Sequence, residues 1–528
     1  MGGLWPGEEG AAASAGRALS PQDAGLPAGL VALVGVALVA LAGGLYVAPE
    51  AGAQAIAAAG LGGLVAWTLW RRPELGVIAL LAVTSGFLDP DALDLRLPFG
   101  GLDLRDLLLL GLLGLVFARK LLSTESLALP WWPVSGPLLG LMAIGALSAL
   151  DAIGFRGVEP NWALGELRAV AYYAAFIATV WAIRKREQMV VLLAGFFLIA
   201  DLTAAVIVAQ QFGGQNTPLA NLIGGEWVFR NMGEGSAGFG RLRVVPAGHA
   251  LAFFASVFAL ALLIGAGQSG WRRAFFAAQV AFLNFALVLT YTRAQWLASL
   301  IAVVVMALLV PRAEKARLAK YLAVAGLAVG LVLFGVAGSG SRSSQGELFL
   351  DILAARAGSL LSPSQTIATD SLQWRVFESE QSLLAISAEP VLGVGLGNSY
   401  RGVTLLAGEA GDFETRLTRY VHNSYLYVAT KMGLLGLSAL LWFLLAFLVG
   451  SWRLGRRMAA GPWKSIAVAT FAGFVGFLQW SFTHAHFMHP ETTATIGALV
   501  GVVACLRLLE RGRGESKAPL SGGDAVVR

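Results

Sequence analysis

The sequence predicts an all-α polytopic membrane protein, and three observations lead to this prediction. Of the 528 residues, 57% are hydrophobic and 13% are charged, whereas soluble domains average about 25% charged residues. The mean hydropathy is +0.70. The apolar residues form blocks of roughly 17–25 residues, the length that crosses a hydrocarbon core of about 30 Å, and short charged stretches separate these blocks. The composition therefore excludes a soluble protein.

Fourteen apolar segments are present, and we expect each to form a transmembrane helix. The predicted spans are 27–48, 53–70, 75–88, 104–118, 135–152, 168–183, 188–212, 246–266, 274–291, 294–310, 319–337, 424–450, 464–482 and 492–508. They divide the chain into an N-terminal segment at 1–26, spans 1 to 11 within 27–337, a long loop at 338–423, spans 12 to 14 within 424–508, and a tail at 509–528. The polar composition of the tail predicts disorder.

Basic residues occupy every second connecting loop, and this alternation predicts the orientation. These loops carry Arg71–Arg72, Arg119–Lys120, Arg184–Arg186, Arg272–Arg273, Arg312–Lys320 and Arg453–Lys464. Because short loops rich in Lys and Arg stay in the cytoplasm, we expect both termini to be cytoplasmic. Loop 338–423 then lies on the opposite face, where the spacing of its apolar residues predicts two short interfacial helices, at 347–361 and 371–388.

A histidine lies at the end of this outer loop. The run from Tyr420 to Leu426, Tyr-Val-His-Asn-Ser-Tyr-Leu, leads into the twelfth span, and Asn423 or Ser424 is a suitable N-cap for that helix. We therefore expect His422 at the membrane boundary, where an imidazole can accept a proton at neutral pH. The alternative is an interfacial histidine beside a helix cap, without a chemical role.

Three arginines are predicted on the same side of the membrane as His422. Arg241 and Arg243 precede the eighth span, and Arg293 lies in the tight turn between the ninth and tenth spans. The positive-inside bias disfavours basic residues at these positions, so they indicate an anion bound at the membrane surface. The planar guanidinium fork suits a diphosphate. The alternative is that each arginine extends to lipid headgroups.

Two patterns could hold a metal ion, and we favour neither. His484, His486 and His489 lie close together in the sequence, but their spacing fits no regular zinc signature. Asp89 and Asp91 flank a proline, which is also typical of an ordinary turn between two spans. We therefore expect no metal site and no cofactor.

Three further features are weaker indicators of function. Arg375 lies on the second interfacial helix and is expected to pair with Glu378 or Glu380. The run at 393–398, Gly-Val-Gly-Leu-Gly-Asn, looks like a dinucleotide-binding loop, but no βαβ unit surrounds it, so we reject that interpretation. Cys505 is the single cysteine of the chain, which excludes an intramolecular disulfide and a site built from several thiolates.

The order of these elements resembles the O-antigen ligase/polymerase family, which includes O-antigen ligases, Wzy-type polysaccharide polymerases and pilin O-oligosaccharyltransferases. The matching elements are Arg241-Leu242-Arg243-Val244, Leu289-Thr290-Tyr291-Thr292-Arg293, the run from Glu389 to Asn398, and His422-Asn423-Ser424-Tyr425-Leu426 followed by Gly433-Leu434-Leu435-Gly436. The resemblance covers roughly 190–500. A typical member has fewer spans, so the extra N-terminal pair departs from the family pattern.

The resemblance implies a GT-C-like fold and an inverting, metal-independent glycosyltransferase in the bacterial inner membrane. Such an enzyme moves a glycan from undecaprenyl diphosphate to an acceptor hydroxyl on the periplasmic face, with a glycan or a lipid-linked molecule as acceptor and no nucleic acid partner. His422 would act as the general base. Arg241, Arg243 and Arg293 would bind the diphosphate and stabilise its departing charge.

The large outer loop and the extra spans favour a Wzy-type polymerase, with Arg375 and Asn423 as supporting residues of the site. The first alternative is an O-antigen ligase that transfers the glycan to lipid A-core. The second alternative is a transporter or flippase of lipid-linked glycans, which should place ionisable groups near the middle of the membrane. Lys431 is the basic residue that lies well inside a predicted span.

Overall fold

The computed structural model describes residues 63–87, 103–123, 126–213, 229–231, 242–265, 270–338, 370–401 and 418–516. Several predictions concern residues outside these ranges. They are the N-terminal segment 1–26, the first span and most of the second, the Asp89–Asp91 turn, Arg241, the first interfacial helix at 347–361 and the end of the tail.

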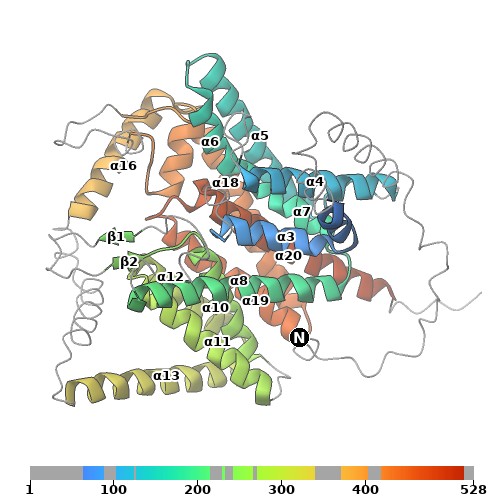
Figure 1. Cartoon of the computed structure of the whole chain (residues 1–528), viewed down its shortest axis with the longest axis vertical. Coiled ribbons are helices and arrows are strands. Elements are labelled where there is room, and N and C mark those ends of the chain that lie inside the picture. The colour runs from blue at the N-terminus through green and yellow to red at the C-terminus, as the bar shows by residue number, and fades with distance from the viewer. Residues whose placement is uncertain are drawn as a thin grey trace, which may run out of the picture.

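The described chain is almost entirely helical (Figure 1). Its elements are α3 (Pro73–Thr84), α4 (Leu104–Leu122), α5 (Trp132–Gly154), α6 (Pro160–Ala171), η2 (Tyr172–Ala174), α7 (Ala175–Ala182), α8 (Arg186–Gly213), β1 (Phe229–Asn231), β2 (Leu242–Val244), α10 (His249–Ile264), α11 (Gly270–Leu289), α12 (Arg293–Leu309), α13 (Arg312–Gly338), α16 (Asp370–Ala388), α18 (Ser424–Arg457), α19 (Pro462–Trp480), η3 (His486–Met488) and α20 (Pro490–Ser516). The two short strands pair antiparallel, with Arg230 opposite Arg243.

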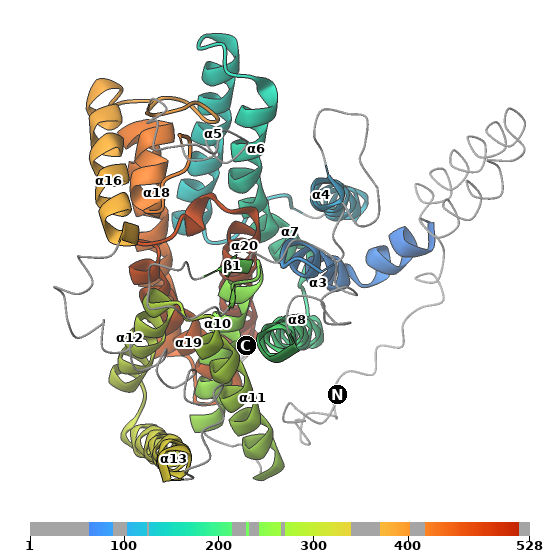
Figure 2. The same cartoon turned by 60° about the vertical axis from the view of Figure 1, so that its left-hand side comes forward.

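Helix α10 lies at the centre of one half of the bundle. All of its residues from His249 to Ile264 are buried. All except His249 and Ser256 are apolar, and apolar residues on every side are the pattern of a helix surrounded by other helices. It packs against α8, α11 and α19. Elsewhere α20 packs on α7 and α3, α5 packs on α18, and α12 packs on α19. Figure 2 shows α18, α5 and α6 together at one end of the molecule, and α10, α11, α12 and α19 toward the other.

Six helices of the described chain are long and apolar enough to cross a membrane: Trp132–Gly154, Pro160–Ala182, Arg186–Phe212, Gly270–Leu289, Ser424–Arg457 and Pro490–Glu510. Three shorter apolar helices, α3, α10 and α12, accompany them. The prediction of an all-α multi-pass membrane protein is therefore confirmed. The number of fourteen spans stays a prediction.

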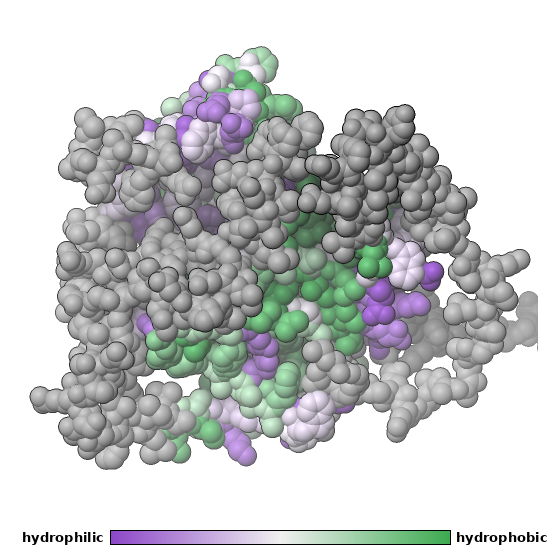
Figure 3. All heavy atoms as spheres, in the orientation of Figure 1, coloured by the Kyte–Doolittle hydropathy of each residue, from purple (hydrophilic) through white to green (hydrophobic). Residues whose placement is uncertain are grey.

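Large apolar side chains lie exposed on the outside of these helices. Leu308 on α12, Trp442 and Leu445 on α18, and Leu150 on α5 are each more than half exposed. Figure 3 shows apolar side chains gathered across the middle of the visible face, with hydrophilic ones toward its edges. Contiguous exposed apolar surface of this kind would be costly in water, so we assign it to contact with lipid.

The predicted start of the sixth span is wrong. We placed it at 168, but α6 begins at Pro160 and continues through the η2 turn into α7. The prediction assigns Glu166 to the preceding loop and Arg168 to the first position of the span. In the structure they are helical residues with partners: Arg168 contacts Asp103 at 3.2 Å and Asp106 at 3.0 Å, and Glu166 contacts a lysine described below. Paired charges are tolerated inside a helical bundle where isolated ones are not.

Two contacts place the start of α12 and the start of α18 at the same end of the bundle. Gly476, near the end of α19, packs directly against the backbone of Ala298, near the start of α12. Ser481 directly follows the end of α19, and its carbonyl accepts a hydrogen bond of 2.9 Å from the Ser424 backbone N–H at the start of α18. Arg293, the first residue of α12, therefore lies at the same end as the start of α18.

Candidate functional site

Local sequence chemistry positions His422 immediately before helix α18. As predicted, Asn423 is the N-cap: its side-chain oxygen accepts hydrogen bonds from the backbone N–H groups of Tyr425 at 2.9 Å and Leu426 at 3.2 Å. The cap ends the extended segment at Asn423 and begins the helix at Ser424. His422 is thereby held at the end of the bundle rather than within a span.

A buried carboxylate binds the His422 imidazole. Glu378, on α16, places its Oε2 atom 2.7 Å from His422 Nδ1 and 3.3 Å from the His422 backbone nitrogen. The other oxygen, Oε1, accepts a hydrogen bond of 3.0 Å from Trp374 Nε1. The Glu378 side chain is 1% exposed and that of His422 is 20% exposed. The histidine therefore faces open space on one side and a fully buried acid on the other.

The predicted interfacial helix at 371–388 is present as α16, from Asp370 to Ala388. Its role at the site was not foreseen. Glu378 or Glu380 is the predicted partner of Arg375; the Glu378 carboxylate bonds with His422 and Trp374. Glu378 precedes His422 by 44 residues, and no local sequence rule connects residues at such a separation.

Aromatic residues and an arginine surround this pair. The Arg401 guanidinium lies over the rings of Trp374 at 4.6 Å and Phe377 at 5.4 Å. Tyr420 contacts the His422 ring edge to face, with ring centres 4.8 Å apart. Burial raises the pKa of Tyr400 to about 12, so its hydroxyl stays protonated and donates to the Tyr420 carbonyl at 3.2 Å.

The glycine-rich run at 393–398 docks onto a break in helix α18. Gly433 has φ 65° and ψ −171°, which interrupts the helix and leaves preceding carbonyl groups without their usual partners. The backbone N–H of Val394 donates to the Thr430 carbonyl at 2.8 Å, and that of Gly395 donates to the Lys431 carbonyl at 3.1 Å. The run therefore donates hydrogen bonds to the carbonyl groups that the break in α18 leaves without partners. This structural role agrees with our rejection of a dinucleotide-binding loop.

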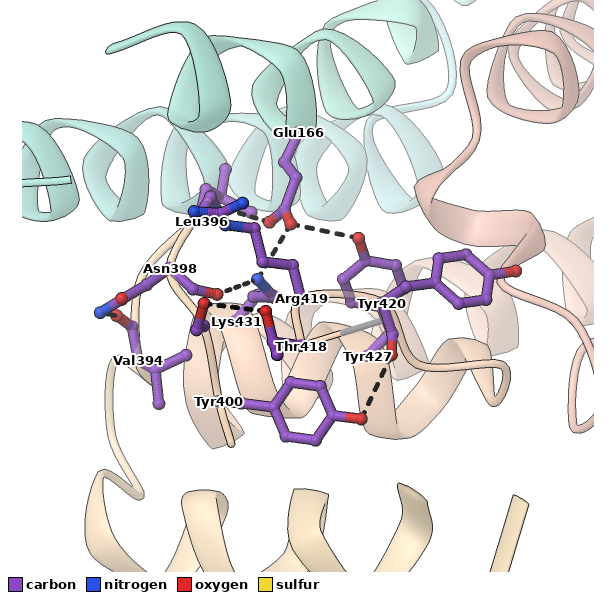
Figure 4. A network of polar contacts seen from close by, with 12 residues as sticks. Glu166, Val394, Leu396, Asn398, Tyr400, Thr418, Arg419, Tyr420, Tyr427 and Lys431 are labelled. Atoms are coloured by element: carbon purple, nitrogen blue, oxygen red, sulfur yellow. Dashed lines mark hydrogen bonds and ion pairs between the residues drawn. The ribbon is translucent and has the colours of Figure 1, made fainter. Parts of the chain in front are cut away.

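An ion pair joins helix α6 to helix α18 beside this run (Figure 4). Glu166 Oε1 lies 2.9 Å from Lys431 Nζ and accepts a hydrogen bond from the Tyr427 hydroxyl at 3.2 Å. Its other oxygen accepts the Gly397 backbone N–H at 2.7 Å. Lys431, which is completely buried, also donates to the Asn398 carbonyl. The network connects α6, the glycine-rich run and α18, and Lys431 is neutralised within it.

The structure describes two of the three arginines that are predicted to bind the diphosphate. Arg293 begins α12 at the same end of the bundle as His422. Arg243 lies in strand β2, opposite Arg230, and Arg241 lies outside the described residues. Convergence of these arginines with His422 on one cavity remains a prediction. A cavity of about 200 Å³ lies at the other end of the bundle, where Leu309 and Lys464 are among its lining residues.

The histidine-rich segment forms an aromatic cluster. The His486 ring lies 4.4 Å from that of Trp480 and 4.8 Å from that of Phe477, and burial lowers the pKa of His486 well below its ordinary value. The His489 ring nitrogen Nε2 lies 3.3 Å from the Tyr420 hydroxyl. Among the residues that the structure describes, no group of three histidine, cysteine or acidic side chains is arranged to hold a metal ion.

A comparison with known protein families finds a match in the region that contains this site. Residues 277–441 match the family model Wzy_C, which is described as O-Antigen ligase. The chain carries an O-antigen ligase domain. This confirms the family resemblance seen in the sequence. The O-antigen ligase domain contains Arg293, Glu378, His422 and the break at Gly433, whereas the Arg241–Arg243 element precedes it. No curated protein matches the chain.

Members of this family are glycosyltransferase-type enzymes that act in membranes on lipid-linked glycans. The O-antigen ligase domain together with the apolar helices therefore supports a glycosyltransferase-like function in a multi-pass bacterial membrane protein.

Proposed function

We propose that the protein transfers a glycan from undecaprenyl diphosphate to an acceptor sugar hydroxyl on the periplasmic face of the inner membrane, as a Wzy-type polysaccharide polymerase. The observation that carries the proposal is the pair of His422 and Glu378, within the O-antigen ligase domain, at 2.7 Å. In this arrangement both termini are cytoplasmic and the site is periplasmic.

His422 acts as the general base in this proposal. The acceptor oxygen forms a bond to the anomeric carbon of the donor sugar while the bond from that carbon to the diphosphate oxygen breaks, with inversion. The acceptor hydroxyl loses its proton as the new bond forms, and Nε2 of His422 takes this proton. The proton then passes to solvent, which His422 can reach because its side chain is 20% exposed.

Arginines stabilise the leaving diphosphate. A diphosphate needs no proton in order to depart, but its developing charge must be stabilised, and guanidinium groups supply paired charge-assisted hydrogen bonds. We assign this role to Arg293 and to one of Arg241 and Arg243. The reaction then proceeds without a divalent cation.

The competing transporter function would use ionisable groups inside the membrane. Lys431 was the candidate for such a group, but it is buried in an ion pair with Glu166 and donates to a backbone carbonyl. It therefore has a structural role. An O-antigen ligase remains the alternative within the transferases, because the matching family model carries that description.

Reconstitution into vesicles tests the proposal against both alternatives. A labelled oligosaccharide on undecaprenyl diphosphate is supplied together with either a second lipid-linked glycan or lipid A-core. A polymerase releases undecaprenyl diphosphate and lengthens the lipid-linked glycan, whereas a ligase glycosylates lipid A-core only. Movement of the intact donor across the bilayer, without cleavage of the sugar–diphosphate bond, would contradict a transferase.

A further inference from the structure

We propose that Glu378 is a positioning residue for His422: it selects the imidazole tautomer and orients the ring so that Nε2 is the basic atom. The proposal rests on the proposed role of His422 as general base and adds a second residue to it. It is argued from the donors and acceptors that meet at the Glu378 carboxylate.

Three nitrogen atoms contact this carboxylate, and two of them are certain donors. Oε1 accepts from the indole N–H of Trp374, and Oε2 accepts from the backbone N–H of His422, at 3.0 Å and 3.3 Å. The third contact is His422 Nδ1, 2.7 Å from Oε2. Two of these donors, an indole N–H and a backbone N–H, cannot act as acceptors. The side chain at position 378 must therefore present acceptors on both of its terminal atoms.

This requirement determines the tautomer of His422. An ionised carboxylate only accepts hydrogen bonds, so Nδ1 carries the proton in the bond to Oε2. In a neutral imidazole Nε2 is then unprotonated and able to accept a proton. Within the described part of the chain Nε2 makes no hydrogen bond, and the His422 side chain is partly exposed. The basic nitrogen is therefore left available to an acceptor hydroxyl.

The fold also holds the carboxylate in place. Glu378 lies one helical turn after Trp374 on α16, which sets the indole N–H beside Oε1. The Arg401 guanidinium lies over the ring of the same indole, at 4.6 Å from its centre. A carboxylate that is 1% exposed and bonded on both oxygens has little freedom to rotate.

An amide at this position would disrupt the arrangement. Glutamine has nearly the same shape as glutamate but replaces one acceptor oxygen with a donor NH₂ group. If the NH₂ group takes the place of Oε1, it faces the Trp374 N–H, and these two donors cannot form a hydrogen bond with each other. If it takes the place of Oε2, it opposes the His422 backbone N–H and forces Nδ1 to accept, which puts the imidazole proton on Nε2 and removes the base.

The test is Glu378→Gln in the purified full-length protein, measured by glycan transfer from an undecaprenyl-diphosphate-linked donor. Glu380→Gln is the matched control, because Glu380 is an exposed glutamate two residues further along α16. We expect Glu378→Gln to lower kcat by about 10²–10⁴-fold, the range for loss of a positioned base, with donor Kd and KM unchanged. We expect Glu380→Gln to match the parent protein. Glu378→Asp keeps an acceptor-only group and should retain more activity than Glu378→Gln.

A double-substitution cycle separates positioning from a general structural role. If Glu378 acts through His422, adding Glu378→Gln to His422→Ala lowers transfer no further than His422→Ala alone. The proposal is overturned if His422→Ala abolishes transfer while Glu378→Gln behaves like Glu380→Gln, or if Glu378→Gln weakens donor binding and kcat together through misfolding and Glu378→Asp does not recover either. If His422→Ala itself transfers at the parental rate, the proposed function of His422 fails first.

Discussion

Replacement of Gly433 by alanine should destabilise the protein, because the break in α18 depends on this glycine. Gly433 has φ 65° and ψ −171°, a region of backbone space that is essentially restricted to glycine. A Cβ atom at this position would also run into the backbone of Val391 and Leu392. Backbone atoms cannot rotate away as a flexible side chain can, so the glycine-rich run would have to leave the helix.

The expected cost follows from these two effects. The backbone conformation alone costs about 1–3 kcal/mol for a residue other than glycine. Displacement of the run breaks the bonds from Val394 N–H to the Thr430 carbonyl at 2.8 Å and from Leu434 N–H to the Pro390 carbonyl at 2.8 Å, each of which contributes about 0.5–1.5 kcal/mol. The substitution should therefore destabilise the fold by roughly 2–6 kcal/mol.

Thermal unfolding of the detergent-solubilised protein, followed by tryptophan fluorescence, measures this effect. The matched control is Gly140→Ala in α5, where an added Cβ meets no atom within 4 Å. At such a helical position alanine is expected to stabilise by about 0.5–1 kcal/mol. Gly433→Ala should thus unfold at a clearly lower temperature than both the parent and Gly140→Ala. Equal transition temperatures for the two variants would refute the reasoning.

Three further predictions concern the ion pair, the arginines and the metal requirement. Lys431→Met should destabilise the fold by about 3–5 kcal/mol, because it leaves the partly buried Glu166 carboxylate without its ion-pair partner. Combining it with Glu166→Gln should restore part of the lost thermal stability, and no recovery would contradict the pairing. Arg293→Ala should weaken both donor binding and transfer, with donor affinity and transfer rate measured separately. Arg293→Lys should recover only part of each, because a point charge lacks the guanidinium fork. The control, Arg312→Ala at the other end of the bundle, should change neither. Transfer should continue in excess chelator, whereas a complete loss that a divalent cation restores would show a metal requirement.

Features that depend on local chemistry could be predicted from the sequence. The Asn423 cap follows from the preference of asparagine for that position, and α16 follows from the helical spacing of its apolar residues. The membrane class follows from long apolar blocks. In each case the determining residues lie within a few positions of one another, so no knowledge of the tertiary structure was needed.

Features that depend on distant partners could not be predicted. Glu166 suggested a loop because an isolated charge is unfavourable inside a span, and only its pairing with Lys431, 265 residues later, makes it a helical residue. Glu378 likewise gains its role from His422. The run at 393–398 carries glycines with positive φ, but what they contact, such as the α18 backbone at the Gly433 break beside Gly393, depends on the tertiary structure.

The central claim is that His422 accepts the acceptor proton during glycan transfer. The direct measurement is single-turnover transfer by purified His422→Ala with saturating undecaprenyl-diphosphate-linked donor, with donor affinity determined separately and His484→Ala as the histidine control. We predict a loss of about 10²–10⁴-fold for His422→Ala, an unchanged donor affinity, and a parental rate for His484→Ala. Transfer by correctly folded His422→Ala at the parental rate would contradict the account and would leave His422 as an interfacial residue beside a helix cap.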